Sequence, residues 1–161
     1  MDSEEMSRQG VNLEDIMRPA VSVTPDTSAR AVLKILLKNR IPGVPVVDAR
    51  EHLIGFVSDG HLLASALPGY LADMEDLSFV REGRDRWVRY LAEAADRPVG
   101  EVMSRQVSQV ELGRSELAAA HKMIHDGASS VMVTENGKLV GIVNRLDLYA
   151  AVVGIETDLD T

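Results

Sequence analysis

The strongest constraint on the fold is an internal repeat of one ten-residue segment. Residues 53–62 read LIGFVSDGHL, and residues 139–148 read LVGIVNRLDL. Five apolar or glycine positions recur at a separation of 86 residues: Leu53 and Leu139, Gly55 and Gly141, Phe56 and Ile142, Val57 and Val143, Leu62 and Leu148. A repeat of this length indicates two copies of one supersecondary unit. The glycine inside each strand predicts close approach of another backbone or of a ligand.

Composition narrows the classes of function. Of the 161 residues, 45% are hydrophobic and 26% charged, so a core can be buried. The net charge of −8, without a basic run, argues against nucleic acid or an anionic membrane as the main partner. The absence of cysteine excludes disulfides, thiolate metal ligands and a cysteine nucleophile. No secretory signal or membrane-spanning run is recognisable, so we expect a cytoplasmic protein without membrane insertion.

Apolar periodicity predicts the elements of the first copy. They are a helical turn over 12–17, a short strand over 21–23, a helix from Ala29 to about Arg40, strands over 44–48 and 53–57, and a helix from Ser58 or Asp59. The second copy repeats this order, with the separation passing from 86 to 87 and back to 86. We therefore expect a flexible tail over 1–10, units over 11–67 and 97–153, a helical insert over 68–96 and an acidic tail over 154–161.

The insert is long for a connection inside a compact domain. Its residues 85–95 show helical spacing, with Trp87, Val88 and Leu91 on one face. Two interpretations stay open. The insert either packs on the body of the protein, or it is a lid or docking arm that carries the single tryptophan.

The motifs resemble a tandem pair of cystathionine β-synthase (CBS) domains in a small stand-alone form. Four elements recur in order in both copies: DIM or EVM, an amphipathic helix, PVVD or VMVTE, and the corner GFVSDGH or GIVNRLD. The resemblance implies an α/β (α+β) fold of two β-α-β-β-α units packed about a pseudo-twofold axis. It also implies a regulatory, non-enzymatic homodimer whose clefts between units hold adenosine-containing ligands such as AMP, ADP, ATP or S-adenosylmethionine.

The corner of the second copy is the better candidate for a nucleotide site. The family's pattern is Gly-x-x-Thr/Ser-x-x-Asp, and here Gly141 and Asp147 are present while Asn144 replaces the hydroxyl residue. The start of a helix offers free N–H groups to phosphate, and Asp147 can accept from two ribose hydroxyls. Arg145 is a candidate phosphate contact. The candidate walls for adenine are Val131, Met132 and Val133.

The corner of the first copy departs further from the family's pattern. It keeps Ser58, but His61 stands in place of the aspartate, and a neutral imidazole cannot accept from two hydroxyls. Protonated His61 is a candidate phosphate contact. Val44 and Pro45 form the equivalent wall.

These observations predict a module that binds an adenine nucleotide, with or without Mg²⁺, and signals to an unidentified protein partner. The alternative is a ligand-free scaffold that acts through its protein contacts. In that case Ser58 and Asn144 are helix caps, and Asp147 pairs with Arg145 or another neighbour. His121 and His125 have metal-binding spacing but occupy positions expected to be solvated, so we expect neither a metal site nor catalytic residues.

Overall fold

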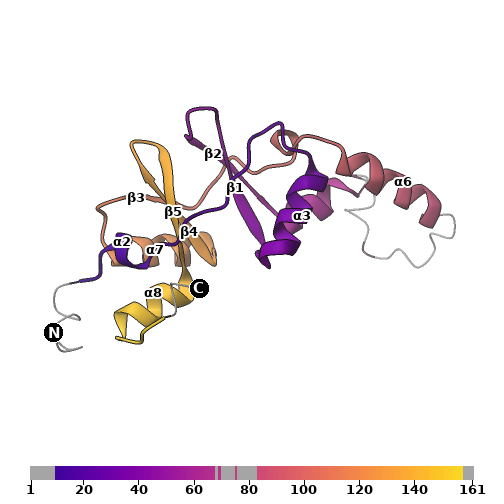
Figure 1. Ribbon diagram of the computed structural model, residues 1–161. Coiled ribbons are helices and arrows are strands. Elements are labelled where there is room, and N and C mark those ends of the chain that lie inside the picture. The colour runs from indigo at the N-terminus through magenta and orange to yellow at the C-terminus, as the bar shows by residue number, and fades with distance from the viewer. Residues whose placement is uncertain (1–9, 68, 70–74, 76–82, 158–161) are drawn as a thin grey trace. The chain divides into compact units, whose positions relative to one another are not determined.

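The computed structural model describes residues 10–67, 69, 75 and 83–157, and these form two compact units (Figure 1). The C-terminal unit consists of residues 10–21, Ala49–Leu53 and 106–157. The N-terminal unit consists of Ser22–Asp48 and Ile54–Arg105. The predicted tail over 1–10, except Gly10, much of the insert before residue 83, and the end of the acidic tail lie outside the described residues.

The C-terminal unit has the predicted β-α-β-β-α order. It comprises β3 (Gln109–Glu111), α7 (Glu116–Asp126), β4 (Ser130–Glu135), β5 (Lys138–Asn144) and α8 (Arg145–Val152). Strand β4 is central, parallel to β3 and antiparallel to β5. Asn136 and Gly137 both have positive φ and turn the chain between β4 and β5, as a two-residue hairpin loop requires.

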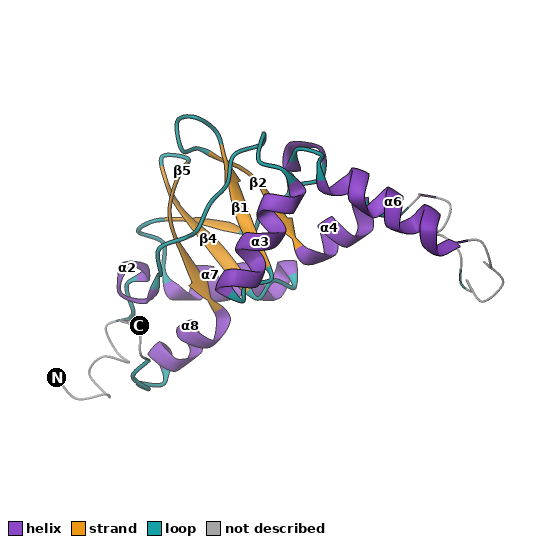
Figure 2. Cartoon of the chain, turned by 45° about the vertical axis from the view of Figure 1, so that its right-hand side comes forward, coloured by secondary structure: helices purple, strands orange, loops and turns teal. Residues whose placement is uncertain are grey.

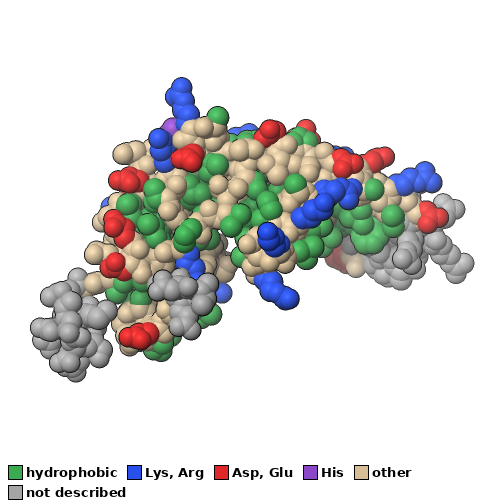
Figure 3. Space-filling view, viewed as in Figure 1, with side chains coloured by type: hydrophobic (Ala, Val, Ile, Leu, Met, Phe, Trp, Pro, Cys, Tyr) green, Lys and Arg blue, Asp and Glu red, His purple; other side chains and the backbone are tan. Residues whose placement is uncertain are grey.

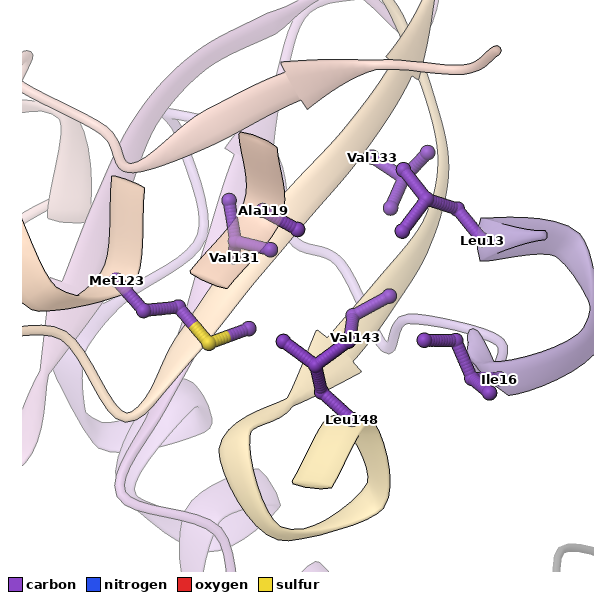
Figure 4. Packing of buried hydrophobic residues seen from close by; sticks show 8 residues of the cluster. All are labelled: Leu13, Ile16, Ala119, Met123, Val131, Val133, Val143 and Leu148. Atoms are coloured by element: carbon purple, nitrogen blue, oxygen red, sulfur yellow. The ribbon is translucent and has the colours of Figure 1, made fainter. Parts of the chain in front are cut away.

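The core of this unit draws on an early segment of the chain as well as on the second copy (Figure 4). Helix α2 (Leu13–Ile16) places Leu13 and Ile16 in this cluster, and both are nearly inaccessible. The other members come from α7, the two long strands and α8: Ala119, Met123, Val131, Val133, Val143 and Leu148. The predicted turn at 12–17 is confirmed, although the Asn12 side chain makes no capping hydrogen bond.

The N-terminal unit repeats the arrangement with a reduced first strand. Its elements are α3 (Ala29–Asn39), β1 (Gly43–Val47), β2 (Leu53–Ser58), α4 (Asp59–Ser65), α6 (Gly83–Ala95) and the 3-10 turn η1 (Val99–Glu101), most of which are visible in Figure 2. The strand predicted at 21–23 is only a parallel bridge between Val23 and Val46. A strand that lacks further partners cannot extend its ladder beyond that bridge.

The helical turn at the start of the first copy lies in the C-terminal unit, and the turn at the start of the second copy lies in the N-terminal unit. In the C-terminal unit, Arg18 exchanges two backbone hydrogen bonds with Ile142, at 2.8 and 2.9 Å. In the N-terminal unit, Ser104 exchanges two with Phe56, also at 2.8 and 2.9 Å. Arg18 and Ser104 are equivalent in the repeat, as are Ile142 and Phe56.

These crossing segments explain the repeated strand glycines. A Cβ on Gly141 would lie 3.0 Å from the carbonyl oxygen of Arg18, and one on Gly55 would lie 3.0 Å from that of Ser104. The approach predicted at these glycines is therefore the approach of another backbone, because only a residue without Cβ leaves room for it.

Helix α6 confirms the helical spacing predicted for residues 85–95. Its Ala94 is buried, and Asp96 just beyond it forms an ion pair with Arg30 of α3 at 3.5 Å. Trp87 and Val88 are 40% and 50% exposed. Among the helices that the structure describes, none combines the length and apolar character needed to cross a membrane.

Candidate functional site

The corner predicted for the second copy lies where β5 passes into α8. Asn144 is the N-cap of α8, with extended backbone, but its side chain does not cap the helix. Its Nδ2 instead donates to Oδ2 of Asp147 over 3.4 Å. Arg145, the first residue of the helix, is exposed. Asp147 is one turn into the helix and is the one charged residue among those described that is buried.

The carboxylate of Asp147 is held by Arg18. Nε of Arg18 donates to Oδ2 over 2.7 Å, and Nη2 donates to Oδ1 over 3.1 Å. This is the fork-to-fork geometry of a bidentate guanidinium–carboxylate pair. The Asp147 side chain is 11% exposed and that of Arg18 is 34% exposed. The hydrogen bonds from Arg18 lower the pKa of Asp147, against a smaller opposite effect of burial.

Arg18 was missed in the sequence because it is 129 residues away from Asp147. Its backbone pairing with Ile142 brings it to the end of β5, where its side chain reaches the start of α8. One signal was available. Arg18 directly follows the repeated DIM motif, and the equivalent position in the second copy is Ser104.

The corner of the first copy is a complete capping box. Oγ of Ser58 accepts from the His61 N–H over 3.1 Å, and Nδ1 of His61 accepts from the Ser58 N–H over 3.0 Å. Because Nδ1 accepts a hydrogen bond, the neutral imidazole carries its proton on Nε2. Protonation of Nδ1 would break this half of the box. The local chemistry of Ser58 and His61 is accounted for by helix capping.

The predicted adenine walls are parts of the two cores. Val131 and Val133 are fully inaccessible members of the cluster in the C-terminal unit, and Val44 has the same place in the N-terminal unit. Met132 is buried but lies outside that cluster, and Pro45 is buried as well. The valine side chains therefore pack inside the protein, and their strands offer a ligand mainly backbone groups.

The two histidines of α7 are exposed and stack on each other, with ring centroids 6.2 Å apart. Nδ1 of His125 contacts Asp126 over 3.1 Å. Hydrogen bonds from Ser108 and His125 lower the pKa of Asp126 to about 2. Within the described part of the chain, no group of three or more potential metal ligands is assembled.

Comparison with known proteins identifies the architecture. A family model for the CBS domain matches residues 13–67 and 99–154. The chain belongs to the CBS domain family. This CBS pair is 30% identical over 147 residues to the CBS domain-containing protein CBSX1, chloroplastic, of Arabidopsis thaliana, and the match covers 86% of this chain and 61% of CBSX1.

Solved structures share the fold of this CBS pair. One is the CBS domain of a CBS domain-containing membrane protein from Sphaerobacter thermophilus, with a TM-score of 0.70, 28% identity and coverage of 92% and 93% of the two chains. Another is CBSX2 of Arabidopsis thaliana in complex with AMP, with a TM-score of 0.67, 24% identity and coverage of 90% and 98%. The predicted fold of two CBS units is confirmed.

Proposed function

We propose that this CBS pair is a regulatory, non-enzymatic module that binds an adenine nucleotide at the corner of its C-terminal unit. The observation that supports the proposal best is the position of Asp147, whose carboxylate lies one turn into α8 at the family's ribose position. The AMP complex of CBSX2, a protein of similar fold, agrees with this choice of ligand class.

The groups around the corner suit the parts of a nucleotide. Each of the two carboxylate oxygens of Asp147 can accept a hydrogen bond from one of the vicinal hydroxyls of a ribose. The positive end of the α8 dipole and the exposed Arg145 offer positive charge to phosphate oxygens. Binding would replace contacts within the unit by contacts to the ligand, and a protein partner would respond to that change. The partner and the cytoplasmic location stay predictions.

A thermal-shift titration tests the ligand class. AMP, ADP or ATP, each with and without Mg²⁺, should raise the melting temperature, because a ligand at 100 times its Kd stabilises the native state by about 2.7 kcal/mol. Asp147→Ala and the isosteric Asp147→Asn should both lose this shift, since neither offers two carboxylate oxygens. Glu135→Gln removes an exposed carboxylate of the same unit and should keep the shift. No shift with any adenylate at millimolar concentration would refute the proposal.

The alternative is a CBS scaffold without a ligand, and one observation favours it. The polar residues of both corners already have partners, Arg18 for Asp147 and a capping box for Ser58 and His61. Under this alternative, adenylates would change the melting temperature of neither wild type nor Asp147→Asn. The thermal-shift titration therefore separates the two functions.

We further propose that the protein is a homodimer that buries exposed apolar residues of its helices. Leu37 on α3 and Ile124 on α7 occupy equivalent repeat positions and are 70% and 81% exposed. Leu63 on α4 and Tyr149 on α8 are another equivalent pair, 58% and 68% exposed. Hydrophobic side chains are visible at the surface in Figure 3. Apolar exposure at the same positions in both copies is expected of a face that another chain covers.

The double variant Leu37→Asp and Ile124→Asp is expected to sediment as a monomer where wild type sediments as a dimer. A charge buried in an apolar interface costs more free energy than the interface contacts recover. Val88→Asp, at a half-exposed position on α6, is the matched control and should leave the dimer intact. Sedimentation equilibrium measures all three proteins. A monomeric wild type, or a dimeric double variant, would contradict the proposal.

A further inference from the structure

The pair of Arg18 and Asp147 occupies the atoms that a ribose would need. Arg18 donates one hydrogen bond to each carboxylate oxygen of Asp147. A vicinal diol bound by the same carboxylate would donate one hydrogen bond to each of these oxygens. In this geometry the guanidinium takes the place of the diol, so the two are alternatives.

We propose that Arg18 is a built-in competitor for the ribose site, which a nucleotide must displace from Asp147 before its diol can bind. The inference rests on the proposed function, because it assumes that Asp147 accepts ribose hydroxyls. It adds Arg18 as a residue that sets the affinity of the site for the nucleotide. Arg18 lies in the segment of chain that precedes the core residues of the N-terminal unit.

The internal repeat supports this role by contrast. At the two equivalent positions of the N-terminal unit stand Ser104 and His61, so that neither the guanidinium nor the carboxylate is present. The backbone bridge is nevertheless the same in both units, with Ser104 paired to Phe56 as Arg18 is paired to Ile142. The bridge does not require an arginine. The presence of an arginine at this position is therefore explained by the contacts of the Arg18 side chain, whose described partner is Asp147.

Packing around Arg18 allows the side chain to move while the backbone stays in place. Two hydrogen bonds to Ile142 hold the Arg18 backbone, and Met17 lies against the face of Gly141. The Arg18 side chain is 34% exposed, whereas that of Asp147 is 11% exposed. The guanidinium therefore has more access to water than the carboxylate has.

The same asymmetry explains why Asp147 needs a counter-ion. A carboxylate that is largely removed from water and has no partner is strongly destabilising. Arg18 meets this need without a ligand. A ligand that binds Asp147 through its diol must replace both hydrogen bonds, and the free energy of breaking the pair is subtracted from its affinity.

Isothermal titration of the full chain with AMP and with 2′,3′-dideoxy-AMP tests the inference. Arg18→Gln should bind AMP about three- to tenfold more tightly than wild type, the change expected when a partly exposed charge pair no longer competes. The gain should be absent with 2′,3′-dideoxy-AMP, which lacks the hydroxyls for which Arg18 competes. Arg18→Lys keeps the charge but cannot donate two parallel hydrogen bonds, so its affinity for AMP should lie between those of wild type and Arg18→Gln.

The matched control is Arg114→Gln, which removes one exposed positive charge from the same unit and should bind AMP as wild type does. Thermal unfolding of each variant confirms that it is folded, and Arg18→Lys carries the test if Arg18→Gln does not fold. Equal or weaker binding by the Arg18 variants would overturn it and leave the proposed function intact. No binding by any of the proteins would overturn both.

Discussion

Met123→Ala is expected to lower the free energy of unfolding by about 2–5 kcal/mol, as large-to-small changes in a packed core do. The Met123 side chain is 2% exposed and packs in the core of the C-terminal unit with residues of α2, β4, β5 and α8 (Figure 4). Truncation removes apolar contacts and leaves a cavity that the surrounding strands cannot fill. Urea denaturation followed by circular dichroism measures the change.

The neighbouring position supplies the control. Ile124 on the same helix is 81% exposed in a single protomer, so at protein concentrations low enough to keep the chain monomeric, Ile124→Ala should change the free energy of unfolding by no more than about 0.5 kcal/mol. The repeat provides the same pair in the N-terminal unit, where Leu36 is 5% exposed and Leu37 is 70% exposed. Similar effects for Met123→Ala and Ile124→Ala would show that α7 does not bury the face described here.

Gly141→Ala is expected to destabilise the protein by about 1–3 kcal/mol, the usual cost of adding a methyl group where no space exists. The new Cβ would lie 2.8 Å from Sδ of Met17 and 3.0 Å from the carbonyl oxygen of Arg18. The thioether can rotate away, but the carbonyl accepts a hydrogen bond from Ile142 and cannot. The substitution should also displace Arg18 from Asp147, and unfolding in urea measures the loss of stability.

Gly60→Ala is the matched glycine variant. Gly60 lies in α4, and a Cβ there would meet only the Ser58 Oγ at 3.6 Å, an ordinary contact. Alanine is a better helix former than glycine, so the change should be neutral or stabilising by up to about 1 kcal/mol. Equal destabilisation by the two substitutions would mean that the close backbone approach at Gly141 is not the cause.

Much of the architecture was predictable because it depends on local patterns. Helix α3 runs from Ala29 to Asn39, as the apolar spacing predicts, and Ser28 caps it by accepting from the Ala31 N–H. The β-α-β-β-α order followed from the repeat. The strand predicted over 21–23 was wrong in extent, because the number of bridges that it forms depends on neighbouring strands rather than on its own residues.

The candidate site was predictable in position and less so in its contacts. Spacing from Gly141 placed Asn144 and Asp147 at the start of a helix, where the structure has them. The capping alternative holds for Ser58, whereas Asn144 contacts Asp147 instead. The partner of Asp147 is Arg18, not the adjacent Arg145, because a side chain's partner depends on which segments the fold brings together.

The sequence by itself determined the two copies, their elements and the polar residues at each strand-to-helix corner, since these depend on spacing along one stretch of chain. Only the tertiary structure decided that α2 packs in the core of the C-terminal unit, and that Val99 packs in the core of the N-terminal unit. The apolar pattern of a short helix shows that one face is buried but not which core buries it. The same path of the chain carries Arg18 to Ile142, and so places a guanidinium on the carboxylate of Asp147.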